Sequence, residues 1–139
     1  MYYLLSESAL LPARDVKIES VKINTLDDFC LTNRVDHISY LKIDTEGGDL
    51  AVLEGAVLML TKFRIDLIQV KVGMNPFNRR HVSFESIKEF LESHRYYLFG
   101  IYGQVKERPN SEPHLRRTNP IFISKQMIET HKISAKPSV

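Results

Sequence analysis

Apolar and polar positions alternate in blocks along the chain, and these blocks predict strands. The runs 38–43 (ISYLKI) and 66–72 (DLIQVKV) contain few polar residues, which is the pattern of parallel strands buried on both faces. The run 96–102 (YYLFGIY) predicts another strand, and 119–124 (NPIFIS) predicts a last one, at an edge or antiparallel. The β-branched run 16–23 (VKIESVKI) predicts one strand or two short ones.

Helical spacing of apolar residues separates these strands. We expect Thr25 to cap a short helix over residues 26–32, with two aspartates in its first turn. Apolar residues recur at helical spacing through residues 50–60, and Asp49 stands where an N-cap belongs. Ser83 is expected to start a further helix. This alternation predicts an α/β fold, half of a doubly wound domain.

The pattern indicates one domain over residues 16–124. Residues 1–15 predict an irregular N-terminal arm, and residues 125–139 predict a polar tail that frays. Two polar segments within the domain, 74–82 and 103–118, predict loops.

Composition narrows the class of protein without identifying a function. The 139 residues are 43% hydrophobic and 26% charged, as in ordinary soluble domains. A formal charge of +2 is too small to argue for nucleic acid, and the arginine pairs 79–80 and 116–117 lie in predicted loops. No apolar run approaches the length of a membrane span, and no signal peptide is recognisable, so we expect a cytoplasmic protein. Cys30 is the single cysteine and is expected to be buried and inert.

The segment LKIDTEGGDLAVLEGA, which begins at residue 41, is the strongest candidate for chemistry. Asp44 ends a predicted strand and Glu46 lies in the turn. Gly47 and Gly48 permit a positive φ and close approach of a ligand. Carboxylates at this position can bind a cation, orient a hydroxyl or accept its proton. The alternative is structural: Asp49 caps the following helix, and Glu46 accepts hydrogen bonds from nearby amides. For Asp49 we favour the structural interpretation; for Asp44 and Glu46 both interpretations stay open.

The same segment resembles the signature of FkbM-type methyltransferases, approximately lKiDvEGaElevLkGa. VKINTLDDF at residues 21–29 is similar to the family's upstream TLDdf motif, and IDLIQVKVG at 65–73 falls where the family has its next strand. FESIKEFLESHRYYLFGIY at 84–102 and NPIFI at 119–123 resemble the closing helix and the last two strands. The resemblance covers residues 16–124.

The resemblance implies a class I, Rossmann-like methyltransferase sheet with flanking helices and a C-terminal antiparallel strand. It implies S-adenosylmethionine as cofactor and O-methylation of a small-molecule or sugar hydroxyl. Asp44 and Glu46 would then be catalytic, orienting the acceptor hydroxyl and drawing off its proton, and positioning would carry most of the effect. Asp44 and Gly47 would lie beside the methyl donor. Metal assistance through the same carboxylates stays open, but the sequence does not demand it, and no residue is assigned to a metal.

Two departures from the family affect these expectations. No G-x-G turn for the cofactor and no ribose-binding acid after a second strand are recognisable, and Lys71 stands where the family's strand carries an acid. We therefore expect a partial domain that lacks its N-terminal cofactor-binding half and leaves strand 38–43 with an open edge. Such an edge suggests a truncated gene product, self-association or a complementary N-terminal half. A non-catalytic interaction module is the alternative function, and His81 and His94 are expected as surface or helix-face residues, not ligands.

Overall fold

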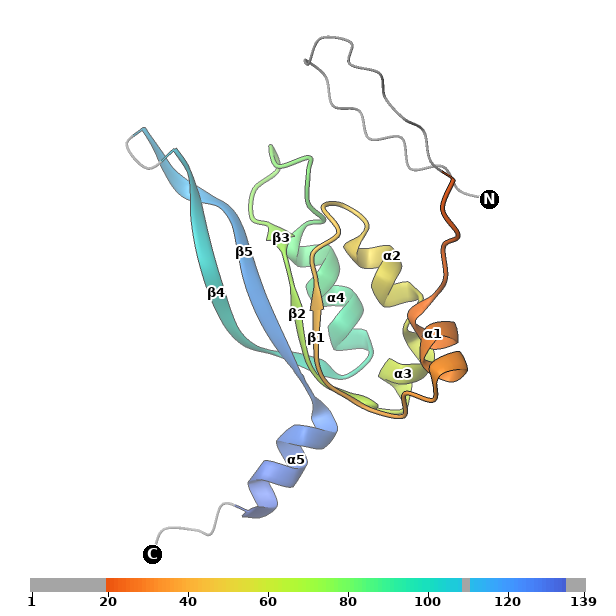
Figure 1. The fold of residues 1–139 in the computed structure, drawn as a ribbon. Helices are drawn as coiled ribbons and strands as arrows, with labels where there is room; N and C mark the ends of the chain where they lie inside the picture. Colours follow the sequence, from red (N-terminus) through yellow and green to blue (C-terminus); the bar gives the residue numbers. More distant parts are fainter. Residues whose placement is uncertain (1–19, 109–110, 135–139) are drawn as a thin grey trace, which may run out of the picture.

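The computed structural model describes residues 20–108 and 111–134, which form a mixed sheet with helices against it (Figure 1). The strands are β1 (Ile38–Ile43), β2 (Ile65–Val70), β3 (Val72–Gly73), β4 (Tyr96–Arg108) and β5 (Glu112–Ser124). The helices are α1 (Leu26–Asn33), α2 (Asp49–Glu54), α3 (Val57–Thr61), α4 (Phe84–Ser93) and α5 (Lys125–Ser134). The α/β class predicted from the sequence is confirmed.

Local sequence signals explain where the helices begin. The Thr25 side chain accepts a hydrogen bond from the Asp28 amide at 3.1 Å, and Ser83 does the same for the Ser86 amide at the start of α4. Both predicted caps are confirmed. The single helix expected after Asp49 is instead two short helices, α2 and α3, because the chain leaves helical geometry at Gly55.

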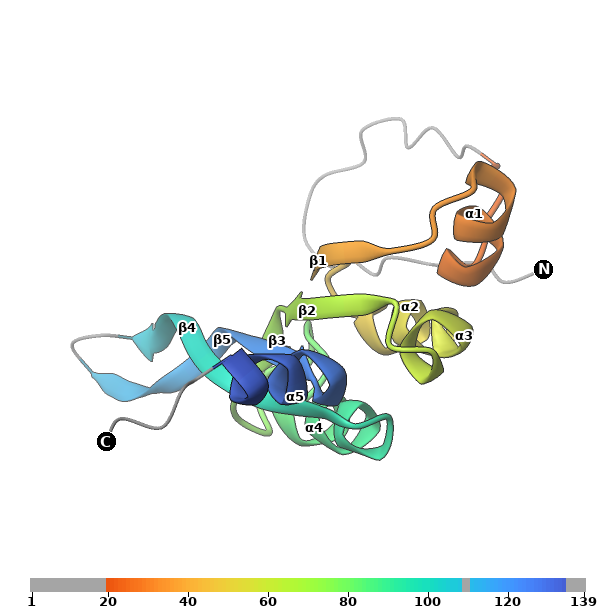
Figure 2. The same cartoon turned by 90° about the horizontal axis from the view of Figure 1, so that it is seen from below.

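The sheet combines one parallel pair with an antiparallel ribbon. β1 and β2 run parallel, whereas β5 lies between β2 and β4 and is antiparallel to both. β3 also pairs with β5 and keeps the register of β2, so β2 and β3 form one line that is interrupted at Lys71. Among the described residues β1 pairs with β2 alone and lies at the outer edge of the sheet (Figure 2). The expected open edge of strand 38–43 is therefore present in the described part of the chain.

The core lies between one face of the sheet and the helices. Fully buried residues of the strands meet fully buried residues of α2, α3 and α4, among them Ile68, Phe122, Leu53, Leu60 and Ile87. The opposite face is not covered by described residues in the same way, since Tyr40 on β1 is 47% exposed and Tyr97 on β4 is 41% exposed. The expectation that strand 38–43 is buried on both faces is wrong for residues 20–108 and 111–134, in which helices cover one face of the strand and leave Tyr40 on the other face exposed.

Two segments differ from their predicted structure. Residues 103–108 and 111–118, within a segment predicted as a loop, continue β4 and β5 as a long antiparallel ribbon that extends away from helices α1–α4 (Figure 1). Their side chains are mostly exposed on both faces of this ribbon, so the apolar alternation that marks a strand is missing from the sequence. Residues 125–134, expected within a fraying tail, form the helix α5.

The remaining predictions concern the two ends of the domain. The final strand is confirmed as antiparallel, but it is an inner strand and not an edge. Residues 20–23 form no strand, and residues 16–19 lie outside the described residues, as does the predicted arm over 1–15.

Candidate functional site

The turn between β1 and α2 has a backbone that requires glycine. Glu46 has φ of 51° and Gly47 has φ of 120°, a region that residues with a side chain rarely adopt. A Cβ atom at Gly47 would also lie 3.3 Å from the carbonyl oxygen of Arg80. The turn is therefore packed directly against the backbone of the 74–82 loop.

Asp49 is the fully buried carboxylate that holds this turn together. Its Oδ1 accepts a hydrogen bond from the Thr45 amide at 2.9 Å, and its Oδ2 accepts one from the Gly47 amide at 3.2 Å. The N-cap of α2 is Gly48, without a side-chain cap. The expectation that Asp49 is the N-cap is wrong, although its role is structural: it binds amides of the preceding turn in place of those of the helix.

Asp44 lies at the carboxyl end of β1, where its side chain meets Lys71. The Lys71 Nζ lies 2.7 Å from Asp44 Oδ1, and the Lys71 amide donates to the carbonyl of Ile43 at 3.2 Å. The hydrogen bond from Lys71 is the main reason that the pKa of Asp44 is lowered, against a smaller opposing effect of burial. Lys71, which departs from the family pattern, is thus the partner of the first candidate catalytic residue.

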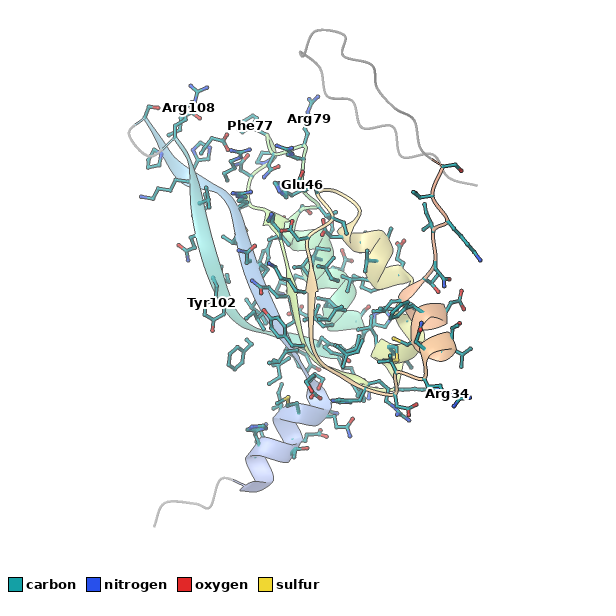
Figure 3. All side chains as sticks on the ribbon, in the orientation of Figure 1. Arg34, Glu46, Phe77, Arg79, Tyr102 and Arg108 are labelled. Carbon is teal, nitrogen blue, oxygen red and sulfur yellow. The ribbon has the colours of Figure 1, made fainter. Side chains whose placement is uncertain are left out.

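Glu46 also has a cationic partner. Its Oε2 lies 3.2 Å from Arg80 Nη2, and both side chains are more than half exposed, at 51% and 66%. An ion pair this accessible to water contributes little to stability and opens readily. Figure 3 shows Glu46 near the end of β1, on the same side of the molecule as Phe77 and Arg79 of the 74–82 loop.

The 74–82 loop is fixed over the strand ends by the Asn78 side chain. Its Nδ2 donates to the carbonyl of Arg116 on β5 at 2.8 Å. Its Oδ1 accepts from the amides of Arg80 and His81 at 3.1 and 3.3 Å. The Gly73 amide donates to the Val82 carbonyl at 2.8 Å, which closes the other end of the loop. This loop is therefore an ordered part of the site.

His81 lies near the charged residues of this turn, which the sequence did not predict. It is 6% exposed, so its expected place on the surface is wrong. Burial is the main reason that its pKa is lowered, and the positive charges of Lys71 and Arg117 lower it further; Glu46 and Asp49 oppose this. The only sequence signal for this burial is Asn78 three residues earlier, which can form the Asx-type turn seen here.

The other residues singled out by sequence lie away from this turn. His94 ends α4, where its Nδ1 lies 2.8 Å from the Phe90 carbonyl and its ring packs on the Phe90 ring. Cys30 is buried as predicted, and burial raises its pKa. Within residues 20–108 and 111–134 no group of three or more histidine, cysteine or acidic side chains is placed to hold a metal ion. No helix in this part of the chain is long and apolar enough to cross a membrane.

Two cavities lie near the amino ends of β1 and β2, away from the Asp44–Gly47 turn. One, of about 340 Å³, is lined by His37, Asp66 and residues of α5; the other, of about 440 Å³, lies between α1 and α3. The turn itself offers carboxylates and a glycine to a ligand, but the described residues provide no glycine-rich turn of the kind that holds a nucleotide. The groups that the turn itself offers to a ligand are therefore the side chains of Asp44 and Glu46.

Comparison with known proteins agrees with the signature in this turn. The model of the methyltransferase FkbM domain matches residues 4–98, which include β1, the Asp44–Gly47 turn, Lys71 and the 74–82 loop. No curated protein and no solved structure matched the chain. Since the family model covers more than half of the sequence, the chain belongs to the FkbM methyltransferase domain family.

Proposed function

We propose that this chain is the acceptor-side part of an S-adenosylmethionine-dependent O-methyltransferase with a class I, Rossmann-like fold. The observation that carries the proposal is the family match across the Asp44–Gly47 turn, at the carboxyl end of a parallel strand. Ligands of open α/β sheets bind outside this end of the strands. The antiparallel β5 beside β2 agrees with the C-terminal antiparallel strand expected of such a fold.

In this proposal the turn orients the methyl acceptor. The bound cofactor supplies a methyl group on a positively charged sulfur. Asp44 and Glu46 provide negative charge beside that position and accept hydrogen bonds from the acceptor hydroxyl, a small molecule or a sugar. Gly47 gives the turn its positive φ and its close packing on the Arg80 carbonyl, which fix the position of these carboxylates. Alignment of oxygen, methyl and sulfur supplies most of the acceleration.

The rest of the cofactor pocket comes, in this proposal, from a chain segment that pairs with the open edge of β1. The candidates are a complementary N-terminal half and a second copy of this chain. An exposed edge offers unpaired amide and carbonyl groups to another strand. Size-exclusion chromatography with light scattering tests the second candidate, since a folded monomer at high concentration would argue against self-association.

A non-catalytic interaction module is the second candidate function. One observation favours it: Lys71 neutralises Asp44 at 2.7 Å, where the family pattern has an acid that would leave Asp44 without this partner. In that case the turn is kept for its packing, and the chain acts through the uncovered face of the sheet.

Calorimetry with S-adenosylmethionine separates the two functions. The methyltransferase proposal expects heat from the purified chain, or from the chain with its complementary half, and release of S-adenosylhomocysteine with a panel of hydroxy compounds. Asp44→Asn should keep the fold and lose turnover, whereas the exposed helix residue Asp28→Asn should keep both. If neither the purified chain nor the chain with its complementary half gives heat of binding at millimolar S-adenosylmethionine, the interaction module is favoured.

A further inference from the structure

The carboxylates of the turn are already engaged by other groups. Asp44 is hydrogen-bonded to Lys71, Glu46 pairs with Arg80, and both oxygens of Asp49 accept backbone amides. The hydrogen bond from Lys71 lowers the pKa of Asp44, so this carboxylate is a weaker proton acceptor than a free one. A side chain other than Asp44 is therefore the better destination for the proton of a hydroxyl acceptor at this edge of the sheet.

His81 carries an unused acceptor in this position. Among the described residues its Nε2 is the one buried side-chain nitrogen or oxygen without a hydrogen-bond partner. Its Nδ1 lies 3.1 Å from Asn78 Oδ1, and the Asn78 amide group is oriented by its bond to the Arg116 carbonyl. Because Asn78 Oδ1 can only accept, the proton of the neutral ring belongs on Nδ1. Nε2 is then left with a bare lone pair.

Burial and nearby positive charges favour the neutral form of the His81 ring. Burial is the main reason that the pKa of His81 is lowered, and Lys71 at the junction of β2 and β3 and Arg117 on β5 lower it further. Glu46 and Asp49 oppose these effects. The lone pair on Nε2 of a neutral imidazole can accept a hydrogen bond from a hydroxyl and then its proton. Most buried acceptors have a partner, so an unpaired one requires an explanation.

The backbone places His81 at the strand ends. Its predecessor, Arg80, has its carbonyl against Gly47. Its successor, Val82, accepts a hydrogen bond from the Gly73 amide at the end of β3. The carboxylates of Glu46 and Asp49 act on the pKa of the His81 ring, which agrees with a ring close to the Asp44–Gly47 turn.

We propose that Nε2 of His81 receives the proton of the acceptor hydroxyl during methyl transfer. The inference rests on the proposed function. The hydroxyl oxygen forms the new O–CH₃ bond, the S–CH₃ bond of the sulfonium donor breaks with its electron pair left on sulfur, and the O–H proton moves to Nε2. Asp44 and Glu46 then orient the hydroxyl and act as positioning residues, while His81 is the base.

Two measurements made without cofactor test whether Nε2 of His81 is an unpaired hydrogen-bond acceptor. The variant His81→Leu replaces the ring with an apolar side chain. Asn78 Oδ1 still accepts hydrogen bonds from the backbone amides of residues 80 and 81. Since an unpaired buried acceptor is removed, we expect a melting temperature equal to or above that of the wild type. Nitrogen NMR of the wild-type ring should show a protonated Nδ1 and a bare Nε2 at pH 7. A large drop in melting temperature, or a protonated Nε2, would overturn the proposal.

Turnover and cofactor binding complete the test. With the acceptor compound that supports S-adenosylhomocysteine release, His81→Gln should lower turnover by about 10²–10⁴-fold and abolish the loss of rate at acid pH. The heat of S-adenosylmethionine binding to His81→Gln should equal that of the wild type. The control variant His114→Gln, at an exposed position on β5, should match the wild type in both binding and turnover. If His81→Gln binds S-adenosylmethionine and turns over as fast as the wild type, the role of His81 is overturned while the proposed function stands. Absence of cofactor heat from the wild-type chain and its complemented form overturns the proposed function, and the inference with it.

Discussion

Asp49 should be the residue on which the stability of the turn depends most. Replacing Asp49 with asparagine leaves one oxygen for the Thr45 amide and turns an NH₂ group toward the Gly47 amide, so two donors face each other. A hydrogen bond to a charged group contributes about 1.5–3 kcal/mol, and the bond that remains becomes a weaker neutral one. Asp49 is fully buried, so water cannot replace the lost partner. We expect the free energy of unfolding to fall by about 2–4 kcal/mol.

Urea unfolding followed by circular dichroism measures this change. The midpoint should shift to lower urea concentration while the slope stays constant, because the surface exposed on unfolding is the same. Asp28→Asn is the matched control: it removes the same charge from an exposed first-turn position, where the helix dipole effect is about 0.3–1 kcal/mol.

The reasoning would be refuted if Asp49→Asn unfolded within about 0.5 kcal/mol of the wild type, the range of ordinary surface substitutions. Such a result would mean that the two amides find other acceptors, and that Asp49 is available to a ligand.

Three further predictions follow from the same structure. Lys71→Met should raise the pKa of Asp44 toward its ordinary value, which carbon NMR of the carboxyl group measures. Because the wild-type pKa is lowered, the wild type should be more stable than the variant at neutral pH, and this difference should vanish as the pH falls through the wild-type pKa. An unchanged Asp44 titration would contradict the ion pair. Gly47→Ala should cost about 1–3 kcal/mol in urea unfolding, since φ is 120° and the new Cβ would press on the Arg80 carbonyl; a neutral effect would refute the assigned backbone. Tyr96→Phe should cost about 1–2 kcal/mol because the buried hydroxyl donates to a β2 carbonyl at 2.8 Å. Burial raises the pKa of Tyr96 to about 12, so wild-type stability should fall as pH rises from about 10 to 12, where only the unfolded phenol ionises. The Phe variant should lack that contribution, and identical pH curves for the two proteins would count against it.

Much of the fold could be predicted because its signals are local. The strand 38–43, the caps at Thr25 and Ser83 and the glycine turn after Asp44 depend on residues within a few positions of one another. The β4–β5 hairpin could not be predicted in full, because a ribbon exposed on both faces needs no apolar alternation.

The sequence by itself determined the family signature, the α/β class and the strand end that bears Asp44 and Glu46. Only the tertiary structure decided how those carboxylates are used. Folding brings Lys71 against Asp44 across the β1–β2 pair, and Asn78 anchors its loop to β5 so that His81 becomes buried without a partner for Nε2. These contacts join residues that are distant in the chain, and the charge and hydrogen bonding of a group depend on its neighbours in space.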